Sequence, residues 1–275
     1  GHTLPPFKNE EHLRKVVKQC HDKIFFNLGH DPAKSFDELM KLLFVKMYDE
    51  RMTPRVYRFA ILPDHSLQQG AQNIRNLFSE AIKSPRYSDV FTTRFSKPGE
   101  NVFLDLDDDT IVFVVQQFQS FSLVNTTSTL EGVDIKGTVF ERMVGSTFRG
   151  ELGAYFTPRE LVEFCVRLVD PGPSDMVLDP SCGSGGFLIM VIKHAAEKIL
   201  KEHPNLSEAE LASAIRDFSE KNVFGVDINE RMVRVAKMNR VMHGDGHSGI
   251  CKSQGANVGH SDRVPRKKES VDKVC

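Results

Sequence analysis

The stretch that decides the fold is residues 176–187, with the sequence Met-Val-Leu-Asp-Pro-Ser-Cys-Gly-Ser-Gly-Gly-Phe. It begins with an apolar run, turns at Asp179-Pro180 and continues into a glycine-rich loop. A short apolar run ended by turn residues predicts a buried strand, and apolar residues at helical spacing predict a helix over 187–200. Strand, glycine loop and helix form the opening unit of nucleotide-binding α/β folds. We therefore expect a ligand at the end of this strand, where glycines permit a close approach and the helix start favours an anion.

The common nucleotide motifs do not fit this loop. A dinucleotide fingerprint requires a third glycine three residues after Gly185, but Leu188 stands there. A P-loop requires a lysine after the glycines, and none follows them. The ligand of the loop is therefore neither a dinucleotide nor a nucleoside triphosphate held in one of these two ways.

Residues 179–187 instead resemble the S-adenosylmethionine loop of DNA methyltransferases that methylate base amino groups, in particular the modification subunit of type I restriction-modification systems. A second string, Gly-Ala-Tyr-Phe-Thr-Pro-Arg at 153–159, resembles the segment of that family that lies on the cofactor. Aromatic faces attract cations, and the cofactor carries a sulfonium. Taken alone, the two aromatic residues are better explained as a hydrophobic staple at a helix start, with Thr157 as the N-cap. Their distance from the glycine loop, which is the usual one in the family, favours the cofactor role instead. The resemblance is loose before Asp134 and close from there to Gly246.

Asp227 is the third feature of the predicted site. It ends the stretch 222–226, Asn-Val-Phe-Gly-Val, which predicts a second short strand. An acid at this position holds a ribose through its hydroxyl groups, and Ile228 is expected to pack on the adenine. Asp227 alone is equally well explained as the N-cap of a helix over 230–242, and the two roles are compatible. By resemblance, the cofactor-binding residues are Ala154, Tyr155, Phe156, Thr157, Pro158, Arg159, Asp179, Pro180, Ser181, Cys182, Gly183, Ser184, Gly185, Gly186, Phe187, Asp227 and Ile228.

The segment before the loop lacks another glycine motif of this kind and is predicted to be mostly helical. Apolar residues recur at helical spacing over 36–50, 71–82 and 110–121, although the β-branched residues of the last segment also allow a strand. An acidic cluster at 105–109 is expected to be a solvated helix start. The predicted fold is α/β: an N-terminal helical domain, 1–148, followed by a partial Rossmann-like S-adenosylmethionine-dependent methyltransferase domain, 149–275.

Composition limits the remaining possibilities. The chain has 275 residues and a formal net charge of −1, so it lacks the strong basic excess of many DNA-binding domains. We find no apolar run long enough for a membrane span and predict no membrane partner. The five cysteines form no C-x-x-C pair, which indicates a reducing, cytoplasmic location without a metal site.

The resemblance implies a site-specific DNA adenine-N6 methyltransferase subunit that acts on double-stranded DNA with a specificity subunit and a restriction subunit. Methyl transfer in this family also needs an Asn or Asp, two prolines and an aromatic residue after a fourth strand, and we find no such motif. Residues 271–275 look like the strand that leads into it, so we expect a chain truncated before the motif and name no catalytic residue. The alternatives are a non-catalytic assembly fragment of such a complex and a protein or RNA amine methyltransferase.

Overall fold

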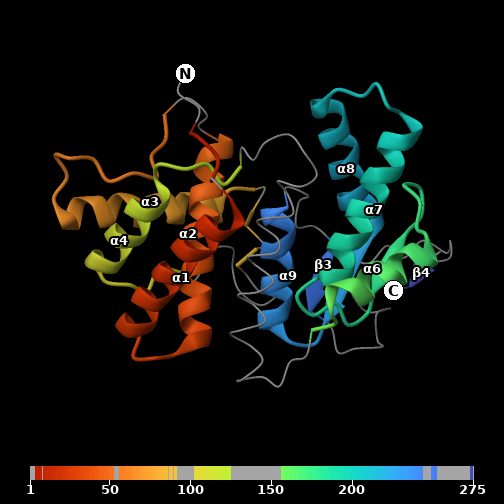
Figure 1. The fold of residues 1–275 in the computed structure, drawn as a ribbon. Coiled ribbons are helices and arrows are strands. Elements are labelled where there is room, and N and C mark those ends of the chain that lie inside the picture. Colours follow the sequence, from red (N-terminus) through yellow and green to blue (C-terminus); the bar gives the residue numbers. More distant parts are fainter. Residues whose placement is uncertain are drawn as a thin grey trace. The chain divides into compact units, whose positions relative to one another are not determined.

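The computed structural model describes residues 4–7, 9–52, 56–85, 87–88, 90–91, 102–124, 156–243, 249–252 and 273–274. The chain divides into two compact units, residues 1–154 and 155–275 (Figure 1). The domain boundary predicted from the sequence, between 148 and 149, falls outside the described residues and stays a prediction.

The N-terminal unit is helical. Its described helices are α1 (Glu10–Asn27), α2 (Pro32–Met52), α3 (Leu67–Lys83) and α4 (Asp108–Phe118). The helices predicted over 36–50 and 71–82 are confirmed as parts of α2 and α3, and 110–121 is a helix rather than a strand. Asp107 caps α4 by accepting a hydrogen bond from Thr110, with two further aspartates in the first turn. This confirms that the acidic cluster is a helix start.

Helix α2 organises this unit through buried carboxylates. The Asp49 side chain accepts backbone N–H bonds from Arg58 and Phe59, at 2.7 and 2.8 Å. Glu50 accepts backbone N–H bonds from Leu123 and Val124 and also lies 3.0 Å from the ammonium of Lys46. A buried carboxylate needs such partners, because water no longer solvates it. The loops that follow α2 and α4 are thereby fixed to one central helix.

The C-terminal unit contains a small parallel sheet. Its strands are β1 (Val177–Asp179), β2 (Val223–Asp227), β3 (Ile250–Lys252) and β4 (Lys273–Val274), in the spatial order β3-β2-β1-β4. The helices are α6 (Arg159–Val169), α7 (Gly186–Glu202), α8 (Glu208–Asn222) and α9 (Glu230–Met242). The predicted strand at the end of the chain is confirmed in β4, which pairs with β1 in parallel. The fold class is therefore helix-rich, with a parallel α/β unit after a helical one.

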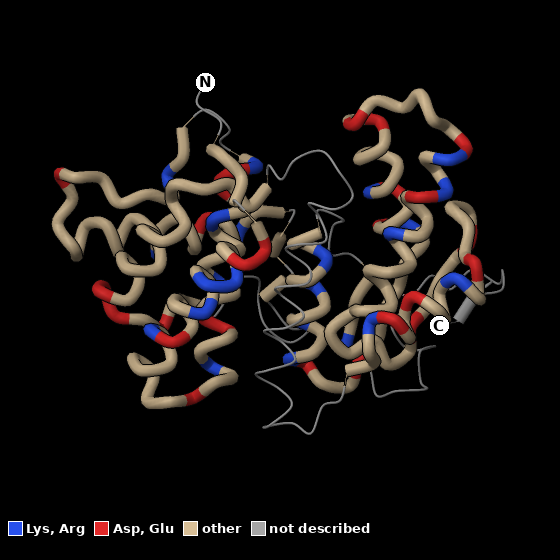
Figure 2. The backbone as a smooth tube through the Cα atoms, viewed as in Figure 1, with Lys and Arg blue, Asp and Glu red and all other residues tan. Residues whose placement is uncertain are grey.

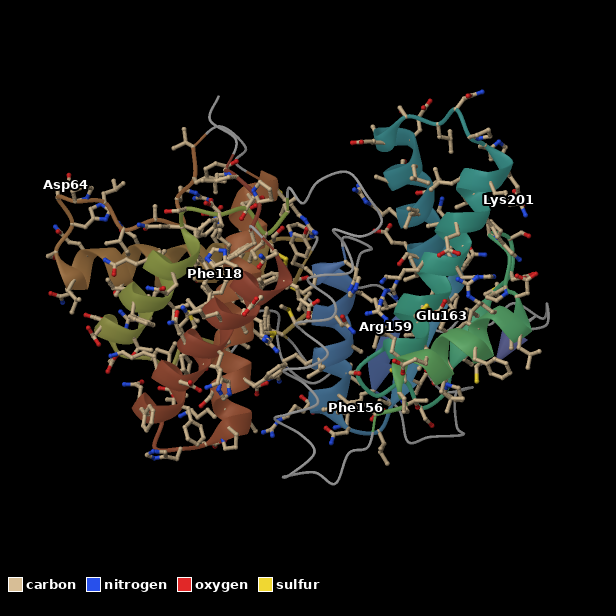
Figure 3. The ribbon with its side chains drawn as sticks, in the orientation of Figure 1. Asp64, Phe118, Phe156, Arg159, Glu163 and Lys201 are labelled. Carbon is tan, nitrogen blue, oxygen red and sulfur yellow. The ribbon has the colours of Figure 1, made fainter. Side chains whose placement is uncertain are left out.

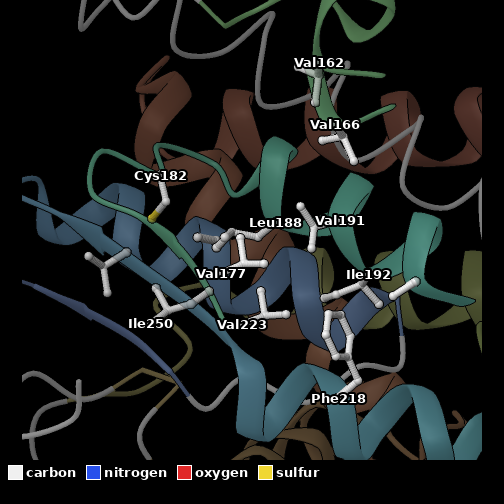
Figure 4. Packing of buried hydrophobic residues seen from close by; sticks show 13 residues of the cluster. Val162, Val166, Val177, Cys182, Leu188, Val191, Ile192, Phe218, Val223 and Ile250 are labelled. Carbon is white, nitrogen blue, oxygen red and sulfur yellow. The ribbon is translucent and has the colours of Figure 1, made fainter. Parts of the chain in front are cut away.

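One face of the sheet meets the helices in a continuous core (Figure 4). Val177 and Val223 from neighbouring strands pack with Leu188 of α7 and Phe218 of α8. Both Val177 and Val223 are fully buried, as expected for central parallel strands. The opposite face carries a separate cluster built on Leu178, Phe224 and Val226. Strands with both faces buried explain why the sequence shows continuous apolar runs here rather than alternation.

Helix α6 differs from its sequence prediction. Helical spacing suggests that Leu161, Phe164, Val166 and Leu168 face the core. Val166 is buried as expected, but 49%, 62% and 74% of Leu161, Phe164 and Leu168 are exposed. The face that packs on α7 is carried by Val162 and Val166. Helical spacing identified an amphipathic helix, but it placed the larger apolar residues on the wrong side.

Charges of both signs are interspersed along most helices of both units (Figure 2). Helix α9 is an exception, with Arg231, Arg234, Lys237 and Arg240 against the single acid Glu230. Two of these cations, Lys237 and Arg240, are buried. Arg240 donates hydrogen bonds to the carbonyl groups of Ser219 and Val223. The basic sequence of α9 thus serves packing in part, rather than forming an open cationic surface.

No helix in the described part of the chain is long and apolar enough to cross a membrane.

Candidate functional site

The candidate site lies where β1 and β2 end side by side. In the parallel register Asp179 pairs with Gly225, so Asp227 follows two residues beyond this pair at the same edge of the sheet. The carboxylate of Asp227 accepts a hydrogen bond from the backbone N–H of Gly183, at 2.9 Å. The glycine loop that follows β1 is therefore joined directly to the acid that ends β2.

A series of backbone contacts holds the glycine loop in place. The N–H of Cys182 donates to the carbonyl of Val226 at 2.8 Å, and the N–H of Gly185 donates to the carbonyl of Cys182 at 2.7 Å. Gly183 and Gly185 have φ angles of +51° and +83°, which residues with a Cβ rarely adopt. The loop is a tight turn whose conformation requires glycine at these two positions.

The loop leaves the start of α7 open. Gly185 is the N-cap of this helix, and no side chain caps it. A Cβ added at Gly183 or Gly186 would meet no heavy atom within 4 Å, so both glycines border open space. Unpaired N–H groups and the positive end of the helix dipole favour a carboxylate or another anion at this point.

Asp179 is buried at the edge of this space, with 6% of its surface exposed. Burial raises the pKa of its carboxyl group to about 6, and the charge of Asp227 acts in the same direction. A hydrogen bond from the N–H of Ser181 to Asp179, at 3.0 Å, opposes this rise in pKa. The site thus contains two carboxyl groups at neighbouring strand ends, one of them strongly desolvated.

Asp227 is not the N-cap of α9. That role belongs to Asn229, whose side chain accepts hydrogen bonds from the N–H groups of Arg231 and Met232. Asp227 instead accepts the N–H of Asn229 with one carboxylate oxygen, at 2.7 Å, and the N–H of Gly183 with the other. Each oxygen keeps a second lone pair for a ligand. Ile228, beside it, is 67% exposed, which is unusual for an aliphatic side chain at the end of a buried strand.

The remaining predicted residues divide into three groups. Ala154 and Tyr155 lie outside the described residues. Phe156, Thr157 and Pro158 come directly before α6, and Arg159 begins it (Figure 3). The predicted cap by Thr157 is wrong, because Pro158 occupies the N-cap position and no side chain caps α6.

The third group belongs to the loop itself. Pro180 is half-buried and Ser181 is exposed, whereas the side chains of Cys182 and Phe187 pack in or against the hydrophobic core. Ser184 is 7% exposed. Contact of any of these residues with a cofactor stays a prediction.

Sequence reasoning missed three residues that support the loop. Gly225 of β2 lies under it: a Cβ there would come within 2.6 Å of Leu188 Cδ1 and 3.1 Å of Cys182 Sγ. In α9, Ala236 packs against Gly185, and Asn239 donates from its amide to the carbonyl of Ser184 at 3.0 Å. Ala236 and Asn239 are three apart on a helix and so share one face. Their spacing places them on one helix face but does not show which loop that face contacts.

The family model described as N-6 DNA Methylase matches residues 132–275, which is more than half of the chain. The chain belongs to the N-6 DNA methylase family. Its relatives include the type II restriction enzyme and methyltransferase RM.BcgI of Heyndrickxia coagulans, which is 30% identical over 43% of this chain and 17% of its own length. The EcoEI methylase subunit of a type I restriction enzyme from Escherichia coli is 22% identical over 84% of this chain and 49% of its own length.

A solved structure has the same fold. A chain from a structure of a type I R-M system, described for complex assembly and conformational transition, matches with a TM-score of 0.58 and 16% identity over 90% of this chain and 51% of that one. The chain thus spans about half the length of the EcoEI methylase subunit and of this solved chain, and a smaller part of RM.BcgI. The predicted resemblance to type I modification subunits is confirmed.

Proposed function

We propose that this chain binds S-adenosylmethionine at the ends of β1 and β2, as the cofactor-binding part of an adenine-N6 DNA methyltransferase. The observation that carries the proposal is the hydrogen bond between Gly183 and Asp227, which brings the glycine loop and the acid into one site. The strand order β3-β2-β1-β4 matches the first four positions of the doubly wound order 3-2-1-4-5-6, where ligands bind at the carboxyl ends of the strands. It supports a Rossmann-like assignment of the unit.

The chemistry of the residues fits the parts of this cofactor. Free lone pairs on Asp227 suit the ribose hydroxyl groups, and the exposed side chain of Ile228 offers an apolar surface to the adenine ring. The uncapped start of α7 suits the carboxylate of the methionine part. When bound, the cofactor would supply a methyl group activated by a positively charged sulfur. The chain would bind and orient it, while the acceptor site for a DNA base lies in none of the residues we assign.

The partners follow from the relatives as part of the same proposal. A type I methylase subunit and a type I R-M assembly are among the matches, so we propose that the chain works on double-stranded DNA with specificity and restriction subunits. A near-neutral chain, with a net charge of −1, is suited to a complex in which another subunit makes many phosphate contacts.

Calorimetric titration of the full chain with S-adenosylmethionine tests the cofactor assignment. We expect binding by the native chain, and affinity lower by about 10- to 100-fold in Asp227→Asn. The native carboxylate accepts one N–H on each oxygen, from Gly183 and Asn229, whereas an amide has a single acceptor oxygen and its NH₂ would face the other N–H. Glu230→Gln is the matched control, since it removes a nearby acid that pairs with Lys252 on the surface, and it should bind as the native chain does. Absence of binding by the native chain would contradict the proposal and leave the assembly role as the better explanation.

A further inference from the structure

Asn239 stands out among the polar residues of α9, because it is fully buried and contacts the glycine loop. Its side-chain N–H₂ donates to the carbonyl of Ser184 at 3.0 Å, and 0% of its surface is exposed. Its side-chain oxygen is also buried and has no hydrogen-bond partner among the described residues. One turn earlier, Ala236 lies 3.4 Å from the position that a Cβ on Gly185 would take.

The unpartnered oxygen indicates what the side chain contributes. A buried acceptor without a donor costs free energy that an apolar residue of similar size, such as leucine, would avoid. Stability of the helix therefore does not explain an asparagine at position 239. The part of the amide that makes a bond is the N–H₂ group, and its partner is the peptide between Ser184 and Gly185.

The orientation of that peptide matters to the site. While Asn239 donates to the Ser184 carbonyl, that carbonyl oxygen points toward α9. The residue after the Ser184–Gly185 peptide is Gly186, which begins α7 and has open space beside it. A carbonyl oxygen carries partial negative charge. If the peptide rotated, this oxygen would come closer to the helix start and repel the anion that the helix dipole attracts.

We propose that Asn239 is a positioning residue, which fixes the Ser184–Gly185 peptide so that the start of α7 accepts the cofactor. The role rests on the proposed cofactor function. Asn239 acts through the loop and does not itself contact the ligand. The loop is then held at three consecutive residues by hydrogen bonds to the second βα unit: Cys182 to Val226, Gly183 to Asp227 and Ser184 to Asn239. Ala236 lies beside the next residue, Gly185.

Two leucine variants of the full chain separate positioning from general stability. Asn239→Leu removes the bond to the loop. Asn222→Leu is the matched control, because the Asn222 amide also donates to a backbone carbonyl, that of Asp175 at 3.1 Å, in the turn before β1. We expect Asn239→Leu to weaken S-adenosylmethionine binding about tenfold and Asn222→Leu to leave it within about twofold of the native value. Equal effects of the two variants, or none in Asn239→Leu, would overturn the proposal.

Asn239→Asp gives a readout that a purely structural role would not move. A protonated carboxyl group donates a hydrogen bond as the amide does, whereas an ionised one places negative charge against the Ser184 carbonyl. Burial favours the neutral form. For each pH we compare the cofactor affinity of Asn239→Asp with that of the native chain. The ratio of the two affinities should rise at least tenfold between pH 8 and pH 5.5. A ratio that does not change with pH would contradict the positioning role.

A third measurement distinguishes failure of this proposal from failure of the cofactor assignment. Without any ligand, the amides of Gly183 and Gly185 are protected by their bonds to Asp227 and Cys182. Their hydrogen exchange should be about tenfold faster in Asn239→Leu than in Asn222→Leu. If the native chain does not bind S-adenosylmethionine, the proposed function fails, but faster exchange still supports positioning of the loop. Unchanged exchange refutes it.

Discussion

Replacing Asp179 by asparagine should make the stability of the C-terminal unit much less dependent on pH. In the folded chain the pKa of Asp179 is raised from 3.8 to about 6, chiefly by burial. Between these two values the folded state holds a proton that the unfolded state has released, so stability falls as the pH rises through this window. The loss is complete above the folded pKa. A difference of two pKa units corresponds to about 3 kcal/mol.

The amide side chain of the Asp179→Asn variant would keep an oxygen to accept the Ser181 N–H, which is 3.0 Å from the native carboxylate, but would carry no charge to desolvate. We therefore expect Asp179→Asn to match the native chain near pH 4 and to be more stable by about 3 kcal/mol at pH 8. Native-state hydrogen exchange of the β1 and β2 amides measures this. At equal pH the intrinsic exchange rates cancel, and the variant should exchange up to about 100-fold more slowly at pH 8.

A carboxylate with the opposite shift provides the control. The pKa of Glu210 is lowered by its hydrogen bonds to Ser207 at the start of α8. It contributes stability above its unfolded pKa, and that contribution is lost as the pH falls. Glu210→Gln should therefore be less stable than the native chain at neutral pH, with the gap closing in acid. Parallel pH profiles for Asp179→Asn and the native chain would refute the reasoning about burial.

Three further predictions concern the packing around the site and the N-terminal unit. Gly225→Ala should lower the free energy of unfolding by about 1–3 kcal/mol in a urea titration, because the added methyl meets the side chains above β2. Gly172→Ala is the control. The nearest atom to a Cβ at Gly172 is 3.6 Å away, so its free energy of unfolding should stay within about 0.5 kcal/mol of the native value. Ile228→Ser should leave the thermal midpoint nearly unchanged, since the side chain is 67% exposed, yet weaken cofactor binding about tenfold by calorimetry; unchanged affinity would remove Ile228 from the site. Glu50→Gln should destabilise the N-terminal unit more than Lys46→Met. The first variant leaves the buried Lys46 ammonium without its carboxylate, whereas in the second Glu50 still accepts hydrogen bonds from residues 122–124. The reverse order of stabilities in denaturation experiments would contradict this.

The sequence predicted most of the C-terminal unit because local signals and tertiary structure agree there. Short apolar runs ending in Asp179 and Asp227 became parallel strands, and the glycines between Cys182 and Phe187 became the turn. Helix α8 begins with a capping box between Ser207 and Glu210, two residues only three positions apart. In each case the residues that form the feature are close in the sequence.

Predictions failed where the deciding contact joins distant residues or depends on the surroundings. Periodicity shows that α6 is amphipathic, but only its packing on α7 shows that Val162 and Val166 are the buried residues. Asp227 and Asn229 are both suitable caps by type, and only the path of the backbone selects Asn229. Asn239 lies 55 positions from its partner Ser184, a separation that no local pattern in a single sequence can reveal.

The way the glycine loop is fastened has a consequence for synthesis of the chain. The loop is encoded in the first βα unit, but its contacts with Val226, Asp227 and Ala236 come from the second. On the ribosome, residues 182–185 must therefore wait for α9 to emerge before they can settle into their final turn. Until then the nascent polypeptide exposes an unfinished loop, and an arrest or cleavage before β2 would leave the glycine string intact without the contacts that shape it.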